Sequence, residues 1–79
     1  MFEGQTWWIV GASEGLGRAL AKEMDGAGAR LILSARNAGR LQHLCDGLSN
    51  ARALPMDVTD PDDVIRAIAD LGPVDGVVY

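Results

Sequence analysis

The 79-residue sequence has a single cysteine, Cys45, so it cannot form an internal disulfide. This usage fits a reducing compartment, and the cytoplasm is the expected location. The first residues show no basic segment followed by an apolar one, which argues against a secretory signal. No apolar run approaches the ~20 residues that a membrane-spanning helix needs, so no membrane partner is expected.

Positive charge is scarce and scattered along the chain. Seven Lys and Arg residues stand against eleven Asp and Glu residues, for a formal net charge of −4. Without a basic stripe, the surface is a poor partner for nucleic acid. Hydrophobic residues still make up 48% of the chain, which is ordinary globular usage and argues against disorder. At this length we expect one small domain of marginal stability.

Three closely spaced glycines, Gly11, Gly15 and Gly17, follow the apolar residues 7–10 and precede a helix-like segment, 18–24. A helix start leaves backbone N–H groups unpaired and carries partial positive charge, and glycines let an anion approach them closely. The stretch therefore predicts a phosphate-binding turn between a strand and a helix. Taken alone, such a triplet could also be only a turn.

Hydrophobic periodicity predicts strands at 5–10, 30–35, 51–56 and 75–79, separated by three amphipathic helices. Asn37 and Asp60 are the expected N-caps of the second and third helices, with Pro61 at the first helical position. The expected buried stripes of the three helices are, in order, Leu16, Leu20 and Met24; Leu41, Leu44, Cys45 and Leu48; and Val64, Ile65, Ile68 and Leu71.

This alternation predicts an α/β fold with a parallel sheet and helical crossovers. Right-handed crossovers favour a Rossmann-type doubly wound sheet, here partial, with strand order 3-2-1-4. The first two helices would then cover one face of the sheet and the third helix the other. The chain reverses its direction of winding between strands one and four, beside the glycine turn, where such sheets bind ligands.

These residues resemble the amino-terminal part of a classical short-chain dehydrogenase/reductase. Members of that family carry a G-x-x-x-G-x-G turn after the first strand, which Gly11, Gly15 and Gly17 match. Segments 33–36 and 57–60 are also similar to the family pattern. The resemblance implies that residues 1–79 are an NAD(P)-binding Rossmann half-domain, truncated before the catalytic segments. The parent would transfer hydride between nicotinamide and a small carbonyl or alcohol substrate.

The resemblance also implies which residues bind the cofactor. Ser13 can offer a hydroxyl to a phosphate or a ribose. Asp57 would accept a hydrogen bond from the adenine amino group, beside the Val58 backbone; a loop or cap acid is the alternative interpretation of Asp57. The full expected set is Gly11, Ser13, Gly15, Leu16, Gly17, Arg36, Asp57 and Val58.

Arg36 bears on the choice between NADP and NAD. It lies close to the ~20-residue offset from the glycine turn at which an acid would bind the ribose of NAD. No acid occurs in 26–37, and a guanidinium can pair with a 2′-phosphate instead, which favours NADP(H). Against this, Glu14 stands where some NADP-using relatives carry a basic residue. A solvated arginine at a strand end is the alternative interpretation.

Neither a metal site nor a catalytic site is expected in this sequence. His43 and Cys45 should face different directions on a helix, and Asp60, Asp62 and Asp63 are typical helix-start charges, so no metal site is predicted. The family's catalytic Ser and Tyr-x-x-x-Lys do not occur in the sequence, and no Lys follows Tyr79.

The 79-residue chain alone is therefore expected to be inactive. The sequence also allows two alternatives to the interpretation that the chain is part of an oxidoreductase. One is a nucleotide-binding or regulatory module without chemistry, and the other is a structural half that associates with a second chain. Association of the chain into a homo-oligomer is also possible.

Overall fold

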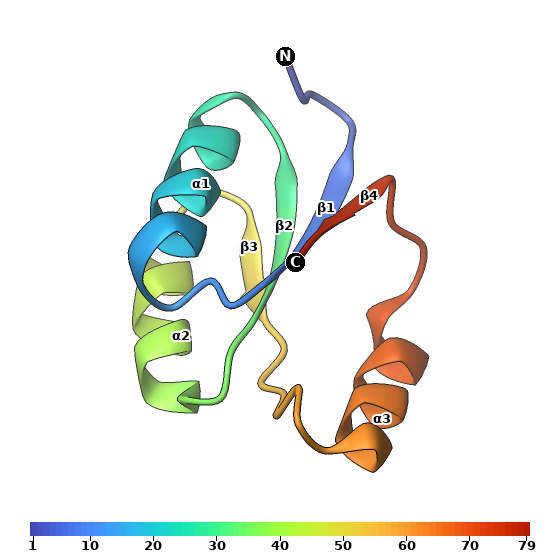
Figure 1. The fold of residues 1–79 in the computed structure, drawn as a ribbon. Coiled ribbons are helices and arrows are strands. Elements are labelled where there is room, and N and C mark those ends of the chain that lie inside the picture. The colour runs from blue at the N-terminus through green and yellow to red at the C-terminus, as the bar shows by residue number, and fades with distance from the viewer.

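The computed structural model describes all 79 residues and shows strands and helices in strict alternation (Figure 1). The strands are β1 (Thr6–Val10), β2 (Arg30–Ser34), β3 (Ala51–Ala53) and β4 (Gly76–Val78). The helices are α1 (Gly15–Gly26), α2 (Ala38–Asp46) and α3 (Pro61–Leu71). None of these helices combines the length and the apolar character that crossing a membrane would require.

All neighbouring strands run parallel, in the order β3-β2-β1-β4, so the predicted α/β class and strand order are confirmed. Helices α1 and α2 cover one face of the sheet, and α3 covers the other (Figure 1). The carboxyl ends of the parallel strands lie at one edge of the sheet, beside the turn that leads from β1 into α1.

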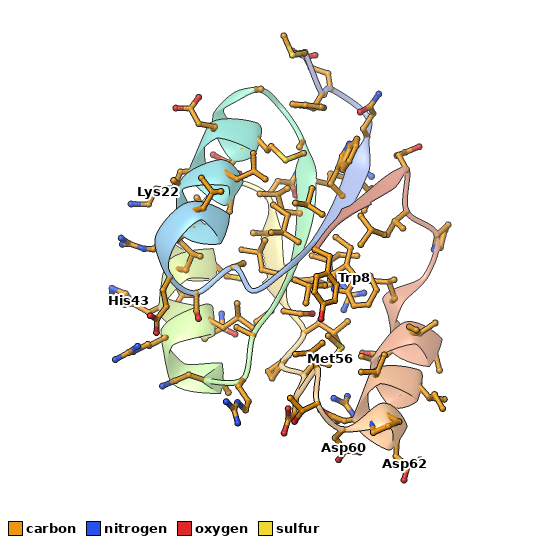
Figure 2. The ribbon with its side chains drawn as sticks, in the orientation of Figure 1. Trp8, Lys22, His43, Met56, Asp60 and Asp62 are labelled. Atoms are coloured by element: carbon orange, nitrogen blue, oxygen red, sulfur yellow. The ribbon has the colours of Figure 1, made fainter.

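Two apolar clusters attach the helices to the two faces of the sheet. On the α1 and α2 face, Ile9 and Leu33 pack with Leu41. On the α3 face, Trp8 packs with Met56, and Figure 2 shows both side chains between the sheet and α3. The Trp8 indole N–H donates to the buried Ser34 hydroxyl at 2.8 Å, which satisfies both polar groups.

The helix starts follow the sequence closely. Asn37 caps α2 by accepting a hydrogen bond from the Arg40 N–H at 3.0 Å. Asp60 caps α3 by accepting from the N–H groups of Asp62 and Asp63, with Pro61 as the first helical residue. Both N-caps are therefore confirmed, and they fix where the loops after β2 and β3 turn away from the sheet.

The predicted buried stripe of α1 is wrong at one of its three positions. Leu16 was expected to be buried, but it is 86% exposed, whereas Ala21 and Met24 are buried. The reason is that Gly17 faces the turn after β1 so closely that a side chain there would overlap the Gly11 carbonyl. The face of α1 that carries Gly17 therefore packs against the turn, while Leu20 is half-buried and Met24 is buried, as predicted.

The expected stripe of α3 is also wrong in part. Ile65 and Ile68 are 66% and 53% exposed, while Ala67 and Leu71 are buried against the Trp8 cluster. The small Ala67 lets the helix approach the sheet, and the two isoleucines are left outside that contact. Burial in this helix is therefore decided by close approach rather than by side-chain size.

Strands β3 and β4 are shorter than the predicted 51–56 and 75–79. After β3, however, the N–H groups of Leu54 and Met56 still donate to the carbonyls of Leu33 and Ala35. The chain therefore stays alongside β2 as far as Met56. This extension carries the following residue, Asp57, to the carboxyl edge of the sheet.

Candidate functional site

The turn from β1 into α1 is shaped by its glycines. Gly11 and Gly15 have φ values of 84° and 59°, in the left-handed region that side chains rarely adopt, and a Cβ on either would meet no atom within 4 Å. Gly17 has the opposite role, because a Cβ there would overlap the Gly11 carbonyl oxygen. Two of the glycines thus leave open space, and the third allows close packing.

The same turn is tied to the neighbouring strand. The N–H groups of Gly11 and Ala12 both donate to the Ser34 carbonyl, at 2.8 and 3.2 Å. At its other end, α1 starts after Glu14, whose side chain makes no capping hydrogen bond. The N–H groups of the first turn of α1 therefore lack intrahelical partners, and the space beside Gly15 is open.

A groove of about 360 Å³ opens at the carboxyl edge of the sheet. It brings together five of the residues predicted from the sequence, namely Gly11, Ser13, Arg36, Asp57 and Val58. Gly15 instead lines an adjoining hollow of about 510 Å³ between α1 and α2, which shares Ser13 and Glu14 with the groove. Leu16 and Gly17 line neither space.

Asp57 occupies the loop after β3 and is held by its own neighbours. Its Oδ1 accepts hydrogen bonds from the Thr59 hydroxyl at 2.6 Å and the Thr59 N–H at 3.0 Å. These bonds, with a smaller contribution from the charge of Arg36, hold the pKa of the Asp57 carboxyl below its usual value. Oδ2 and the Val58 N–H make no hydrogen bond, so both can contact a ligand in the groove.

Charged side chains of both signs line the groove. Arg36 follows the end of β2, is exposed and makes no hydrogen bond or ion pair. Glu14, which stands where some NADP-using relatives carry a basic residue, is paired with Arg40 of α2 at 2.5 Å. The sequence did not predict this pair, because it depends on how α1 and α2 lie relative to each other.

The sequence also missed five residues that line the groove, namely Val10, Ala35, Met56, Thr59 and Tyr79. Their positions at or after strand ends are the only signal that could have indicated them.

His43 is exposed and points outward from α2, as Lys22 does from α1 (Figure 2). Cys45 is buried, and this burial raises the pKa of its thiol. The structure gathers no three His, Cys, Asp or Glu side chains into a group that could hold a metal ion.

A pH dependence of stability is expected from the loop after β3. Asp63 accepts from the Asp57 N–H at 2.6 Å and pairs with Arg66, and these contacts lower the pKa of its carboxyl below the usual 3.8. A lowered pKa stabilises the folded chain above the usual value, and this contribution is lost as the pH falls through the folded value. Asp63→Asn should therefore lower the melting temperature at pH 7, and the difference should disappear in acid.

Melting curves between pH 7 and pH 2 check this expectation. Asp62→Asn is the matched control, since the neighbouring Asp62 carboxylate accepts no hydrogen bond. An equal effect of the two substitutions at pH 7 would contradict the assignment.

Known proteins resemble this chain in sequence over almost its whole length. A profile of the short chain dehydrogenase family matches residues 5–79. The 3-oxoacyl-[acyl-carrier-protein] reductase FabG of Escherichia coli (strain K12) is 38% identical over 98% of this chain and 34% of its own length. Dehydrogenase/reductase SDR family member 7B of Bos taurus is 41% identical over 86% of this chain and 21% of its own. The chain thus spans about a third or less of these relatives.

Solved structures agree with the sequence comparison. The L-sorbose reductase from Gluconobacter frateurii, complexed with NADPH and L-sorbose, superimposes with a TM-score of 0.88 at 26% identity, over 96% of this chain and 32% of its own. A 3-oxoacyl-[acyl-carrier protein] reductase from Brucella melitensis with bound NAD gives a TM-score of 0.84 at 30% identity, over 95% and 31%. With the glycine turn, the strand order and the family match in agreement, the chain belongs to the short-chain dehydrogenase/reductase family.

Proposed function

We propose that residues 1–79 form the NADP(H)-binding half-domain of a short-chain oxidoreductase that transfers hydride between nicotinamide and a small carbonyl or alcohol substrate. The observation that carries the proposal is the groove that Gly11, Ser13, Arg36 and Asp57 line together. These residues come from three separate loops, and each loop follows a strand of the same parallel sheet. Ligands of open α/β sheets bind at this position.

The turn after β1 would hold the pyrophosphate of the cofactor. The open space at Gly11 and Gly15 lets a phosphate approach the backbone, and the unpaired N–H groups of the first turn of α1 can donate to it. Leu16 and Gly17 would contribute their backbone N–H groups, since the Leu16 side chain is exposed and Gly17 has none. The Ser13 hydroxyl, which makes no hydrogen bond within the chain, can donate to a phosphate or a ribose.

The other end of the groove would hold the adenosine. Asp57 can accept from the adenine amino group through its free Oδ2, with the Val58 N–H alongside. Arg36 would pair with a 2′-phosphate, and its lack of a partner within the chain supports this role. The prediction that the chain binds NADP rather than NAD rests on Arg36. Relatives are known with either cofactor, as NADPH in the L-sorbose reductase and NAD in the Brucella reductase.

The chemistry of hydride transfer would come from the bound nicotinamide, while the residues of this chain bind and orient the cofactor.

We propose that the protein is located in the cytoplasm, as the single thiol of Cys45 suggests. Association of copies is also part of the proposal, because β4 pairs on one side only and Val77 on it is 51% exposed.

The direct test is isothermal titration of the chain with NADPH and with NADH. We expect NADPH to bind and NADH to bind more weakly. If a chain that is folded by circular dichroism binds neither cofactor, the proposal is wrong.

Arg36→Ala tests the choice of cofactor. Removing the guanidinium should weaken NADPH binding by ~1.5 to 3 kcal/mol, the usual contribution of hydrogen bonds to charged groups, and leave NADH nearly unchanged. Arg30→Ala is the matched control, since Arg30 is exposed at the amino end of β2, away from the groove. Equal weakening of both cofactors would show that Arg36 does not bind the 2′-phosphate.

A further expected result concerns catalysis. The purified 79-residue chain should show no hydride transfer from NADPH to carbonyl compounds, because it holds no Tyr-x-x-x-Lys to act on the substrate. Absorbance at the nicotinamide band measures this. Turnover above the rate without protein would contradict the proposed division between cofactor binding and catalysis.

A further inference from the structure

An ion pair joins the start of α1 to the start of α2. Arg40 Nη1 lies 2.5 Å from Glu14 Oε1, and the N–H of Arg40 donates to the N-cap side chain of Asn37. The backbone of Arg40 is therefore fixed by the cap of its own helix. Its guanidinium reaches across to a carboxylate that belongs to the turn before α1.

Glu14 lies on the boundary between two spaces. It lines both the groove that contains Arg36 and the adjoining hollow between the two helices, whereas Arg40 lines only the hollow. The pair therefore directs the Glu14 carboxylate toward α2. Without Arg40, that carboxylate would lose its ion-pair partner and could turn toward the groove, although Arg18 also lines the hollow.

This arrangement matters for a ligand that carries a phosphate near Arg36. A carboxylate on the same wall would repel a 2′-phosphate and would compete with it for the Arg36 guanidinium. A ligand without that phosphate would be affected much less. The charge state of the Glu14 and Arg40 pair should therefore act on the difference between NADPH and NADH.

We propose that Arg40 is a positioning residue that sets cofactor specificity by pairing with Glu14, without contacting the cofactor itself. The inference rests on the proposed function of the groove. Arg40 neutralises Glu14 and holds it toward α2, which leaves Arg36 free for the 2′-phosphate. Discrimination between the two cofactors then depends on Arg36, Glu14 and Arg40 against the constant charge of Asp57 in the same groove, and only Arg36 touches the phosphate.

The test measures the ratio of the NADPH and NADH dissociation constants by isothermal titration in a double-mutant cycle. Arg40→Ala should raise this ratio about two- to fivefold, since the Arg40 and Glu14 side chains are 63% and 70% exposed and exposed charge pairs have effects of about that size. Glu14→Gln should lower the ratio or leave it unchanged. The double variant Glu14→Gln/Arg40→Ala should return it close to the original value.

Two controls separate this effect from a structural one. Arg30→Ala removes the same charge at the opposite end of the sheet and should leave the ratio unchanged. Added sodium chloride should reduce the effect of Arg40→Ala, which loss of packing would not explain. Should Arg40→Ala fail to fold, Arg40→Gln keeps more of the side chain and serves in its place.

The outcomes are distinct. An unchanged ratio in Arg40→Ala overturns the inference while leaving cofactor binding in place. A raised ratio that persists in the double variant also overturns it, because Arg40 would then contact the phosphate directly. Absence of binding of either cofactor to the unmodified, folded chain overturns the proposed function, and the inference with it.

Discussion

Gly17→Val is expected to lower the melting temperature of the chain more than any other single substitution considered for α1. Any Cβ at this position overlaps the Gly11 carbonyl oxygen and also meets Ala12, so the obstacle is backbone rather than a flexible side chain. Helix α1 could accept the new side chain only by moving away from β1. We expect a loss of about 3 kcal/mol or more, at the upper end of overpacking effects, against the small total stability of so short a domain.

Thermal and urea unfolding followed by circular dichroism measure this loss. Gly26→Ala is the matched control, because Gly26 lies in the same helix, and a Cβ there meets nothing within 4 Å. That substitution should stabilise the chain slightly, as alanine favours a helix over glycine. A melting temperature for Gly17→Val equal to that of the unmodified chain would show that α1 does not pack as the structure describes.

Gly15→Val is expected to abolish cofactor binding in a chain that still folds. The position has open space around it, so a side chain meets no protein atom but fills the approach to the N–H groups of α1. The φ of 59° adds backbone strain of roughly 1 to 2 kcal/mol, which lowers the melting temperature without unfolding the chain. Titration with NADPH should then show no binding at concentrations that saturate the unmodified chain.

Gly4→Val is the control that separates the effect of backbone strain from the effect of blocking the phosphate. Gly4 has a φ of 79° and similarly open surroundings, but it lies before β1 at the amino end of the sheet. The two valine variants should lose comparable stability, whereas only Gly15→Val should lose binding. If Gly15→Val still bound NADPH with the original affinity, the phosphate would have to bind elsewhere.

The fold was largely predictable because its signals are local. The spacing of Gly11, Gly15 and Gly17, the N-cap residues Asn37 and Asp60, and the alternation of apolar segments each depend on neighbours in the sequence. The right-handedness of crossovers then leaves few ways to arrange four strands. The same signals indicated the loops that line the groove, since each follows a strand.

The errors arose where one element meets another. Hydrophobic periodicity favours large side chains, but the contacts of α1 and α3 with the sheet are made through the small residues Gly17 and Ala67, so Leu16, Ile65 and Ile68 are exposed. The pairing of Glu14 with Arg40 likewise depends on the relative placement of two helices. No sequence spacing encodes such placement.

The shared carbonyl of Ser34 has a consequence for the thermodynamics of binding. It accepts from both Gly11 and Ala12, and thereby fastens the glycine turn to the end of the strand that leads into Arg36. The proposed pyrophosphate site and the backbone at the end of β2 are therefore held at a fixed separation before any ligand arrives. A dinucleotide binding as proposed would order the free Arg36 side chain but little of the backbone, so the backbone's share of the entropic cost of binding should be small.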